Sequence, residues 1–255
     1  MCMNRYVQVM LCLVFLSSPF QASSAETLNL AVANSTCNAI KQVGDMYTQE
    51  TGVNIDYLCK SSGRLAKGLN GNTIQADIYI SANKKWMDFM IEHGLIDAGH
   101  VTSPWGNKLV VAVPASSSLH MEDWQGLVGE DVKTILLGDP GTAPFGRYAK
   151  EALKHTGLWS EVREKVVTKK HITLLADTLA ESDANTVGIL FVSNVSDKLK
   201  IIYPVDESWH SPIYYFMGPV GSATEKPEVM DFISFIQGEK SMAIFGNSGF
   251  RINIE

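Results

Sequence analysis

Residues 28–39 read LNLAVANSTCNA, and the rest of the architecture can be worked out from this stretch. Its apolar beginning, residues 28–32, is typical of a buried strand, and a polar turn with Ser35 and Thr36 follows. Beyond the turn, apolar side chains recur at helical spacing, at Ile40, Val43, Met46 and Tyr47. We therefore predict a strand, a turn and a helix, with Ser35 or Thr36 as the helix N-cap. Because a helix N-terminus carries unpaired N–H groups and a partial positive charge, such a turn can also hold an anion.

The same construction recurs along the next fifty residues. Residues 53–58 alternate like a strand and lead into Ser61-Ser62-Gly63-Arg64 and then a helical run. Residues 76–81 form a third predicted strand, followed by a helix that contains Trp86. Successive strand–helix units predict a parallel sheet with helices on its faces. A serine at one such turn is an ordinary N-cap, but the repetition favours a shared anion site.

A further series of strands and helices begins near residue 109. Strands are predicted at residues 109–113, 134–138, 188–192, 201–205 and 213–217. Helices are predicted after the loop of residues 141–146, from Thr173, and from Pro227 to the C-terminal region. In such sheets ligands bind at the carboxyl ends of the strands. Two lobes of this kind facing each other would bring several helix N-termini to one cleft.

The composition is that of a globular protein. The chain has 255 residues, of which 45% are hydrophobic and 19% are charged, which allows one large domain or two small ones. A net charge of −6 without a basic run argues against nucleic acid as a partner. It does not exclude a small anion, because a local array of N–H donors binds anions against the overall charge.

The first 25 residues have the composition of a secretory signal peptide. Arg5 is the only charged residue among them, residues 7–16 are nearly all apolar, and Ser23-Ser24-Ala25 supplies small residues before a cleavage site at Glu26. No other segment resembles a membrane span or anchor. We therefore expect a soluble, exported, periplasmic protein.

Two cysteines remain after removal of this segment, because Cys2 and Cys12 lie within it. Cys37 and Cys59 would then be paired in an oxidising compartment, and we predict a disulfide between them. In the chain-entropy model, a loop of this length contributes on the order of 3 kcal/mol of stability. The alternative is a pair of buried free thiols.

The sequence lacks the patterns that catalysis requires. The six histidines form no HxH, HExxH or Cys/His pattern, and no GxSxG, P-loop or GxGxxG motif follows a predicted strand. We therefore expect no enzyme activity, no cofactor and no metal site. The recurring groups are hydroxyls and backbone N–H donors at strand-to-helix turns, which suit a fully ionised anion that needs no acceptor.

Seven segments together resemble one family. They are STCNA at 35–39, SSGRLA at 61–66, ADIYISA at 76–82, KWMD at 85–88, GNKLVV at 106–111, GDP at 138–140 and PFGRYAKEAL at 144–153. With these segments the chain resembles the periplasmic molybdate-binding proteins of ABC importers from about residue 28 to 250. Any one segment alone would be a weak signal.

The resemblance implies the type II periplasmic binding protein fold. This is an α/β fold of two lobes, each a mostly parallel sheet flanked by helices, joined by crossing strands. We assign residues 1–25 to the signal peptide, 26–110 to the first lobe, 111–211 to the second lobe and 212–255 to a return into the first. The implied function is capture of molybdate or tungstate in the interlobe cleft and delivery to an ABC permease, by a protein that we expect to be monomeric.

The resemblance also implies which residues contact the oxyanion. The two family serines, which use hydroxyl and amide, fall on Ser35 and Ser62. An alanine amide falls on Phe145, where only the backbone N–H is needed. A valine amide falls on Thr173, just before a predicted helix, and a tyrosine hydroxyl falls on Phe191. Phe191 lines the site but has lost this donor, and the hydroxyl of Thr173 is a candidate replacement.

Phe191, in place of the family tyrosine, allows ligands other than molybdate. A site without the tyrosine hydroxyl leaves another oxyanion or a small organic anion as the alternative ligand. The molybdenum of the bound oxyanion is the only metal expected. A more remote alternative is an exported serine hydrolase, against which the missing general base and oxyanion pattern count. A structural role is the least favoured, because no repeat occurs.

Overall fold

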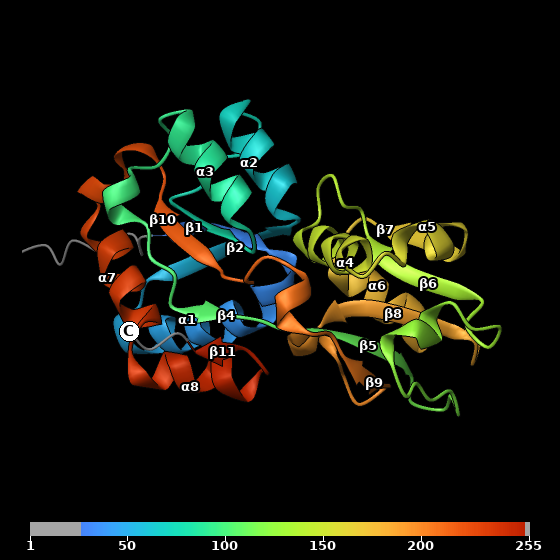
Figure 1. Ribbon diagram of the computed structural model, residues 1–255. Helices are drawn as coiled ribbons and strands as arrows, with labels where there is room; N and C mark the ends of the chain where they lie inside the picture. The colour runs from blue at the N-terminus through green and yellow to red at the C-terminus, as the bar shows by residue number, and fades with distance from the viewer. Residues whose placement is uncertain (1–26, 253–255) are drawn as a thin grey trace, which may run out of the picture.

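The computed structural model describes residues 27–252 of the chain. The predicted signal peptide, residues 1–25, lies outside the described residues together with Cys2 and Cys12. The described chain forms two α/β lobes that lie side by side and are joined by two crossing segments (Figure 1). Within residues 27–252, none of the helices combines the length and the apolar composition required to cross a bilayer.

The first lobe contains a four-stranded sheet in the order β10-β3-β1-β2. Three strands run parallel, and the fourth, β10, is antiparallel to β3. The strands are β1 (Thr27–Ala33), β2 (Asn54–Lys60), β3 (Ile78–Ser81) and β10 (Phe216–Pro219). The helices are α1 (Cys37–Thr51), α2 (Ser62–Asn70), α3 (Lys84–Glu92), α7 (Pro227–Ile236) and α8 (Glu239–Asn247).

Helices cover both faces of this sheet because the side chains of β1 are buried on both sides. Leu30 and Val32 belong to the core shared with α1 and α7, where the Tyr47 ring lies 5.0 Å from that of Phe232. Ala31 points to the opposite core, which α2 and α3 cover. This burial explains the nearly continuous apolar run in the sequence.

The second lobe contains a five-stranded sheet in the order β7-β6-β8-β5-β9. Only β5 runs against the others, since it pairs antiparallel with β8 and with β9 while β6 is parallel to β7 and β8. The strands are β5 (Leu109–Pro114), β6 (Thr134–Gly138), β7 (Val166–Lys169), β8 (Thr186–Phe191) and β9 (Leu199–Pro204). The helices are α4 (Pro144–His155), α5 (Trp159–Val162) and α6 (Ile172–Ala180). The predicted fold class is confirmed.

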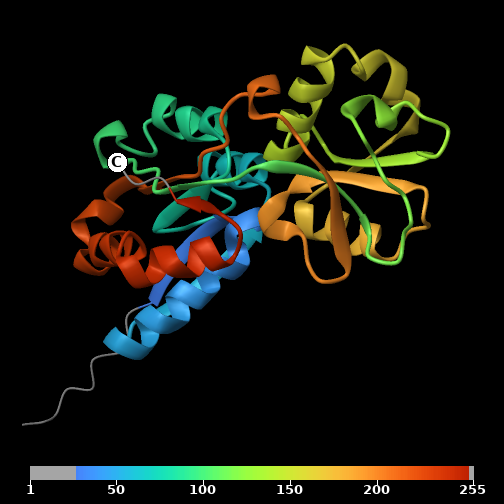
Figure 2. The same ribbon diagram turned by 60° about the horizontal axis from the view of Figure 1, so that its bottom comes forward.

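The two crossing segments lie beside each other between the lobes, as Figure 2 shows. The chain leaves the first lobe after β4 (Trp105–Gly106), which pairs with β11 (Arg251–Ile252), and it returns between β9 and β10. Gly106 and Tyr214 form an isolated antiparallel bridge, and the Asn107 N–H donates to the Ile213 carbonyl at 3.1 Å. The second sheet includes all of β5, so the predicted division between residues 110 and 111 falls inside this strand. The predicted division between 211 and 212 falls in the returning segment.

Two glycines allow α4 to begin very close to the end of β6. A Cβ atom added to Gly146 would lie 2.1 Å from the Gly138 carbonyl oxygen, and one added to Gly138 would lie 2.7 Å from the Gly146 nitrogen. No side chain fits at such distances. The close approach fixes where the first turn of α4, which contains Phe145, lies relative to the sheet.

Candidate functional site

A small cavity lies between the lobes, at the carboxyl ends of the central strands and beside the N-terminal turns of several helices. Its volume is about 10 Å³, the space of roughly one water molecule. The first lobe contributes Ala33, Asn34, Ser35, Ser61, Ser62 and Ala82, and the second contributes Ala143, Pro144, Phe145, His171, Ile172 and Phe191. The fold thus brings together four of the five predicted site residues, namely Ser35, Ser62, Phe145 and Phe191.

Ser35 does not cap a helix, whereas Thr36 is the N-cap residue of α1, one of the two positions predicted. Asn34–Thr36 form a 3-10 turn that runs directly into α1, and neither side chain makes a capping hydrogen bond. Instead, the buried Tyr215 hydroxyl donates to Ser35 Oγ at 2.7 Å. Asn107 Nδ2 donates in turn to the Tyr215 hydroxyl at 3.3 Å. Burial raises the pKa of Tyr215, which therefore stays protonated and acts as a donor.

Ser62 is held in an equivalent way by different partners. It is the first residue of α2 and is fully buried. The Ala82 N–H donates to Ser62 Oγ at 3.0 Å, and the Tyr79 hydroxyl donates to the Ser62 carbonyl at 3.0 Å. Since Ser35 and Ser62 each accept a hydrogen bond from a fixed donor, each keeps its own hydroxyl proton to donate to a ligand.

The second lobe presents a backbone amide and a wall of aromatic rings. The Phe145 N–H lies in the first turn of α4, after Pro144, where helix geometry provides no acceptor. The Phe145 ring packs at the end of β6, 6.2 Å from the ring of Phe191. Phe191 is fully buried, with the rings of Tyr148 at 6.3 Å and Tyr215 at 6.2 Å. These contacts make Phe191 an apolar wall that gives the cavity no donor.

The start of α6 differs from the prediction at Thr173. Thr173 is the second residue of α6 and not the residue before it, because His171 is the N-cap. The His171 ring nitrogen Nδ1 accepts from the Leu174 N–H at 3.2 Å and lies 2.8 Å from Thr173 Oγ1. His171 and Ile172 line the cavity, whereas Thr173 lines a separate pocket with Asn38 and other residues. The sequence signal for this shift is a histidine directly before an apolar helical run.

The cavity is lined by hydrogen-bond donors and by no acidic or basic side chain of the Asp, Glu, Lys or Arg type. Its lining residues, given above, include no Asp, Glu, Lys or Arg. Nδ1 of His171 accepts the hydrogen bond from the Leu174 N–H, so this nitrogen is already engaged with the backbone of α6. A cavity of hydroxyl and amide donors without a carboxylate favours a deprotonated anion over one that carries a proton. Within the described part of the chain, no three His, Cys, Asp or Glu side chains gather into a group that fits a metal ion.

The predicted disulfide is confirmed. Cys37 and Cys59 are bonded, with their Cα atoms 6.1 Å apart. Cys37 is the first residue of α1 and lies two residues after Ser35, while Cys59 is near the end of β2, three residues before Ser62. The bond therefore connects the two turns that carry the cavity serines.

We predict that reduction of this disulfide weakens anion binding as well as stability. Loss of the cross-link is expected to cost on the order of 3 kcal/mol of unfolding free energy and to lower the melting temperature. Binding should also weaken, because the Ser35 and Ser62 turns are no longer tied together. The measurement is molybdate affinity and thermal unfolding of the Cys37→Ser/Cys59→Ser variant below its melting temperature. An affinity equal to that of the wild type would contradict this coupling.

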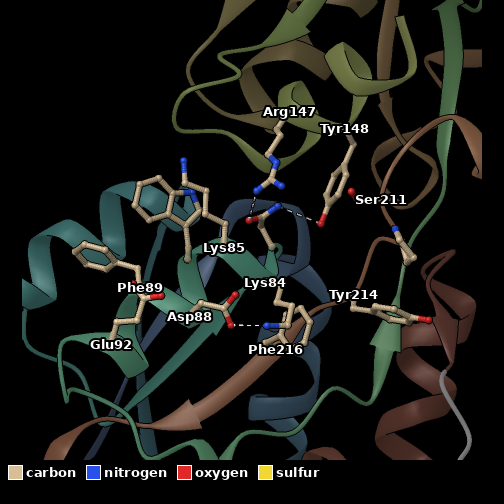
Figure 3. A pocket seen from close by; sticks show the side chains of 13 residues that line it. Lys84, Lys85, Asp88, Phe89, Glu92, Arg147, Tyr148, Ser211, Tyr214 and Phe216 are labelled. Carbon is tan, nitrogen blue, oxygen red and sulfur yellow. Dashed lines mark hydrogen bonds and ion pairs between the residues drawn. The ribbon is translucent and has the colours of Figure 1, made fainter. Parts of the chain in front are cut away.

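A second, larger groove lies between the lobes and contains hydrogen bonds across them (Figure 3). Its volume is about 750 Å³, and α3, α4 and the returning crossing segment line it. Asn83 of the first lobe donates from Nδ2 to the Tyr148 hydroxyl at 3.2 Å and accepts from Arg147 Nη1 at 3.2 Å. Burial raises the pKa of Tyr148 to about 12, so its hydroxyl stays neutral. Glu151 holds Arg147 from the other side at 2.9 Å.

Comparisons with known proteins agree with this architecture. The sequence pattern of the family described as "Bacterial extracellular solute-binding protein" matches residues 28–251. The molybdate-binding protein ModA of Escherichia coli is 28% identical over 233 residues, which are 88% of this chain and 89% of that protein. Among solved structures, the periplasmic molybdate-binding protein of Azotobacter vinelandii has a TM-score of 0.79 and 21% identity, covering 89% of this chain and 100% of that one. The sulfate-binding protein SubI of Mycobacterium tuberculosis has a TM-score of 0.74 and 14% identity, covering 89% and 87%.

Proposed function

The chain belongs to the family of bacterial extracellular solute-binding proteins, and on this premise we propose that it captures molybdate in the interlobe cavity. Tungstate, which has the same charge and shape, is proposed as a second ligand. The protein would act as a monomer in the periplasm and deliver the anion to an ABC permease. The family is one of solute-binding proteins and not of enzymes, so no catalysis and no cofactor are proposed.

The observation that carries this proposal is a cavity lined by hydroxyl and amide donors and by no carboxylate. Ser35 and Ser62 each accept one fixed hydrogen bond and keep a proton to donate, and no carboxylate lines the cavity. A dianion without protons satisfies all of these donors at once, and each hydrogen bond to its charge contributes roughly 1.5–3 kcal/mol. A protonated anion would instead bring a donor that finds no charged acceptor among the lining residues.

We propose the following contacts for the bound anion. The hydroxyls and amides of Ser35 and Ser62 bind it from the first lobe. The amide of Phe145 and an amide in the first turn of α6 bind it from the second. Thr173 was predicted for this last contact, and Ile172, which lines the cavity, is the better candidate in the same turn. Phe191 closes the cavity without a hydrogen bond.

The alternative functions can be compared with the same site residues. Another tetrahedral oxyanion such as sulfate stays a candidate, because Phe191 leaves one fewer donor to recognise the larger molybdate. A small organic anion stays a candidate for the same reason. A serine hydrolase is disfavoured, since the partners of the two serine hydroxyls are a tyrosine and a backbone N–H and not a general base.

A thermal-shift panel tests the proposal. Molybdate, tungstate, sulfate, phosphate and chromate would each be added to the purified protein without its signal peptide. We expect molybdate and tungstate to raise the melting temperature most, because a ligand that binds only the folded state stabilises it. Phosphate, which keeps a proton near neutral pH, is expected to give the smallest shift. The absence of a shift with every anion would refute the oxyanion proposal.

We predict that the hydrogen bonds of Asn83 across the groove strengthen binding by favouring the closed arrangement of the lobes. Asn83→Ala removes two interlobe hydrogen bonds, which at about 0.5–1.5 kcal/mol each should weaken molybdate binding roughly 5- to 100-fold. The measurement is the dissociation constant by isothermal titration calorimetry. Lys84→Ala is the matched control, because the ion pair of Lys84 with Asp88 lies within α3. Equal affinities for the two variants would contradict this role of Asn83.

A further inference from the structure

Ser61 is a buried serine whose side chain has no partner. The residue is 6% exposed, and its hydroxyl oxygen makes no hydrogen bond with any described residue. A buried hydroxyl without a partner typically costs about 1–3 kcal/mol. Such a group lowers the stability of the unliganded protein. One reason to retain it is a hydrogen bond that forms only when a ligand is bound.

Ser61 lies at a position where a serine hydroxyl usually has a hydrogen-bond partner. Ser61 is the N-cap residue of α2, where a serine hydroxyl normally accepts from a backbone N–H of the first turn. His171 makes such a hydrogen bond at α6, and Asp97, Asp123 and Asp206 do so at 3-10 turns, whereas the polar N-cap residues of α1 and α3 do not. At α2 the Ser61 carbonyl accepts from the N–H groups of Arg64 and Leu65 at 2.9 and 3.1 Å, as the carbonyl of an N-cap residue normally does, and the hydroxyl makes no hydrogen bond.

Ser61 lines the same interlobe cavity as Ser35 and Ser62. It therefore combines a helix N-terminus, an unpartnered buried hydroxyl and a place in the wall of a cavity that contains no charged side chain. We propose that the Ser61 hydroxyl is a further direct contact that donates to the bound oxyanion. This inference rests on the proposed function and adds a specific residue to it.

With this assignment the two lobes contribute different kinds of contacts to the anion. With Ser61 included, all three hydroxyls of the cavity come from the first lobe, after β1 and β2. The second lobe supplies backbone amides, the His171 ring and the apolar wall of Phe145 and Phe191. The first lobe then provides most of the contacts to the anion before the lobes close over it.

The proposal predicts opposite changes in stability and affinity for one substitution. Ser61→Ala removes an unpartnered hydroxyl, so the melting temperature of the ligand-free protein should stay equal or rise. The same variant loses a donor to a dianion, so its dissociation constant for molybdate should rise roughly 10- to 100-fold. A serine that serves only the fold would give the reverse pattern, with lower stability and unchanged affinity.

Thr36→Val is the matched control. Thr36 is also a buried N-cap residue whose hydroxyl lacks a partner, but it is not among the cavity-lining residues. We expect this variant to match the wild type in affinity for molybdate and to be at least as stable. Both variants and the wild type would be compared by isothermal titration calorimetry with sodium molybdate and by thermal unfolding without ligand.

Three results would overturn the inference, and they distinguish a failure of the Ser61 contact from a failure of the proposed function. If the wild type binds molybdate and Ser61→Ala binds it equally well, the contact of Ser61 is refuted while the proposed function stands. The contact of Ser61 is also refuted if Ser61→Ala lowers the melting temperature of the ligand-free protein and Thr36→Val weakens molybdate binding as much as Ser61→Ala does. If the wild type binds neither molybdate nor any other tetrahedral oxyanion, the proposed function fails and the inference fails with it.

Discussion

Replacing both anchored serines, Ser35→Ala and Ser62→Ala in one chain, is expected to weaken molybdate binding by about 10²- to 10⁴-fold. Each hydroxyl would donate a charge-assisted hydrogen bond worth about 1.5–3 kcal/mol, and about 1.4 kcal/mol corresponds to a tenfold change. The variant also leaves the Tyr215 hydroxyl and the Ala82 N–H without their acceptors, so some loss of stability should accompany the loss of affinity. Calorimetric titration at a temperature well below unfolding measures the affinity.

Ser241→Ala separates the two effects. Ser241 is the third residue of α8 and is 1% exposed, and its hydroxyl donates to the Phe235 carbonyl of α7 at 2.8 Å. Neither residue lines the cavity. Loss of the Ser241 hydroxyl removes a buried hydrogen bond of the same kind without touching the site. We expect reduced stability and wild-type affinity. A double serine variant that binds as tightly as Ser241→Ala would contradict the assignment of Ser35 and Ser62.

The second large effect is expected at Gly146. Gly146→Ala would place a methyl group 2.1 Å from the Gly138 carbonyl oxygen, and because this atom belongs to the backbone it cannot rotate away. Overpacking of this kind costs about 3 kcal/mol, which for a chain of this size lowers the melting temperature by roughly 6–12 °C. The first turn of α4 would also move away from β6. Molybdate binding should therefore weaken, because this turn carries the Phe145 amide.

Gly99→Ala provides the comparison for Gly146. Gly99 lies in an exposed turn, and the nearest atom to an added Cβ, Asp97 Oδ1, is at the ordinary distance of 3.5 Å. Thermal unfolding of the two variants under the same conditions measures the difference. Similar melting temperatures for both would mean that the close approach of α4 and β6 does not determine where the Phe145 amide lies.

The fold could be predicted because each strand, turn and helix is recognisable from a short, continuous segment of the sequence. Each of the first strands is an apolar run followed by a polar turn and a helical stripe, so β1, β2 and β3 could be recognised one at a time. Their carboxyl ends then meet at one edge of the sheet, which is why Ser35 and Ser62 line the same cavity. The disulfide could be predicted for a similar reason, since only Cys37 and Cys59 remain beyond the signal segment.

The parts of the site that the sequence did not predict depend on distant partners or on a shift of one residue. The hydroxyl that holds Ser35 belongs to Tyr215, 180 residues further along the chain. His171 takes the capping position before α6, which moves the helix start to Ile172 and places Thr173 outside the cavity. The interlobe hydrogen bonds of Asn83 likewise require the two lobes to be placed against each other.

The central claim is that a cavity of hydroxyl and amide donors without a carboxylate selects a tetrahedral anion that carries no proton. The most direct measurement is isothermal titration calorimetry of the signal-free protein at pH 7.5 with sodium molybdate, repeated in the presence of excess phosphate. We predict one molybdate bound per chain, with an affinity that excess phosphate leaves unchanged. Absence of molybdate binding, or effective competition by phosphate, would contradict the claim.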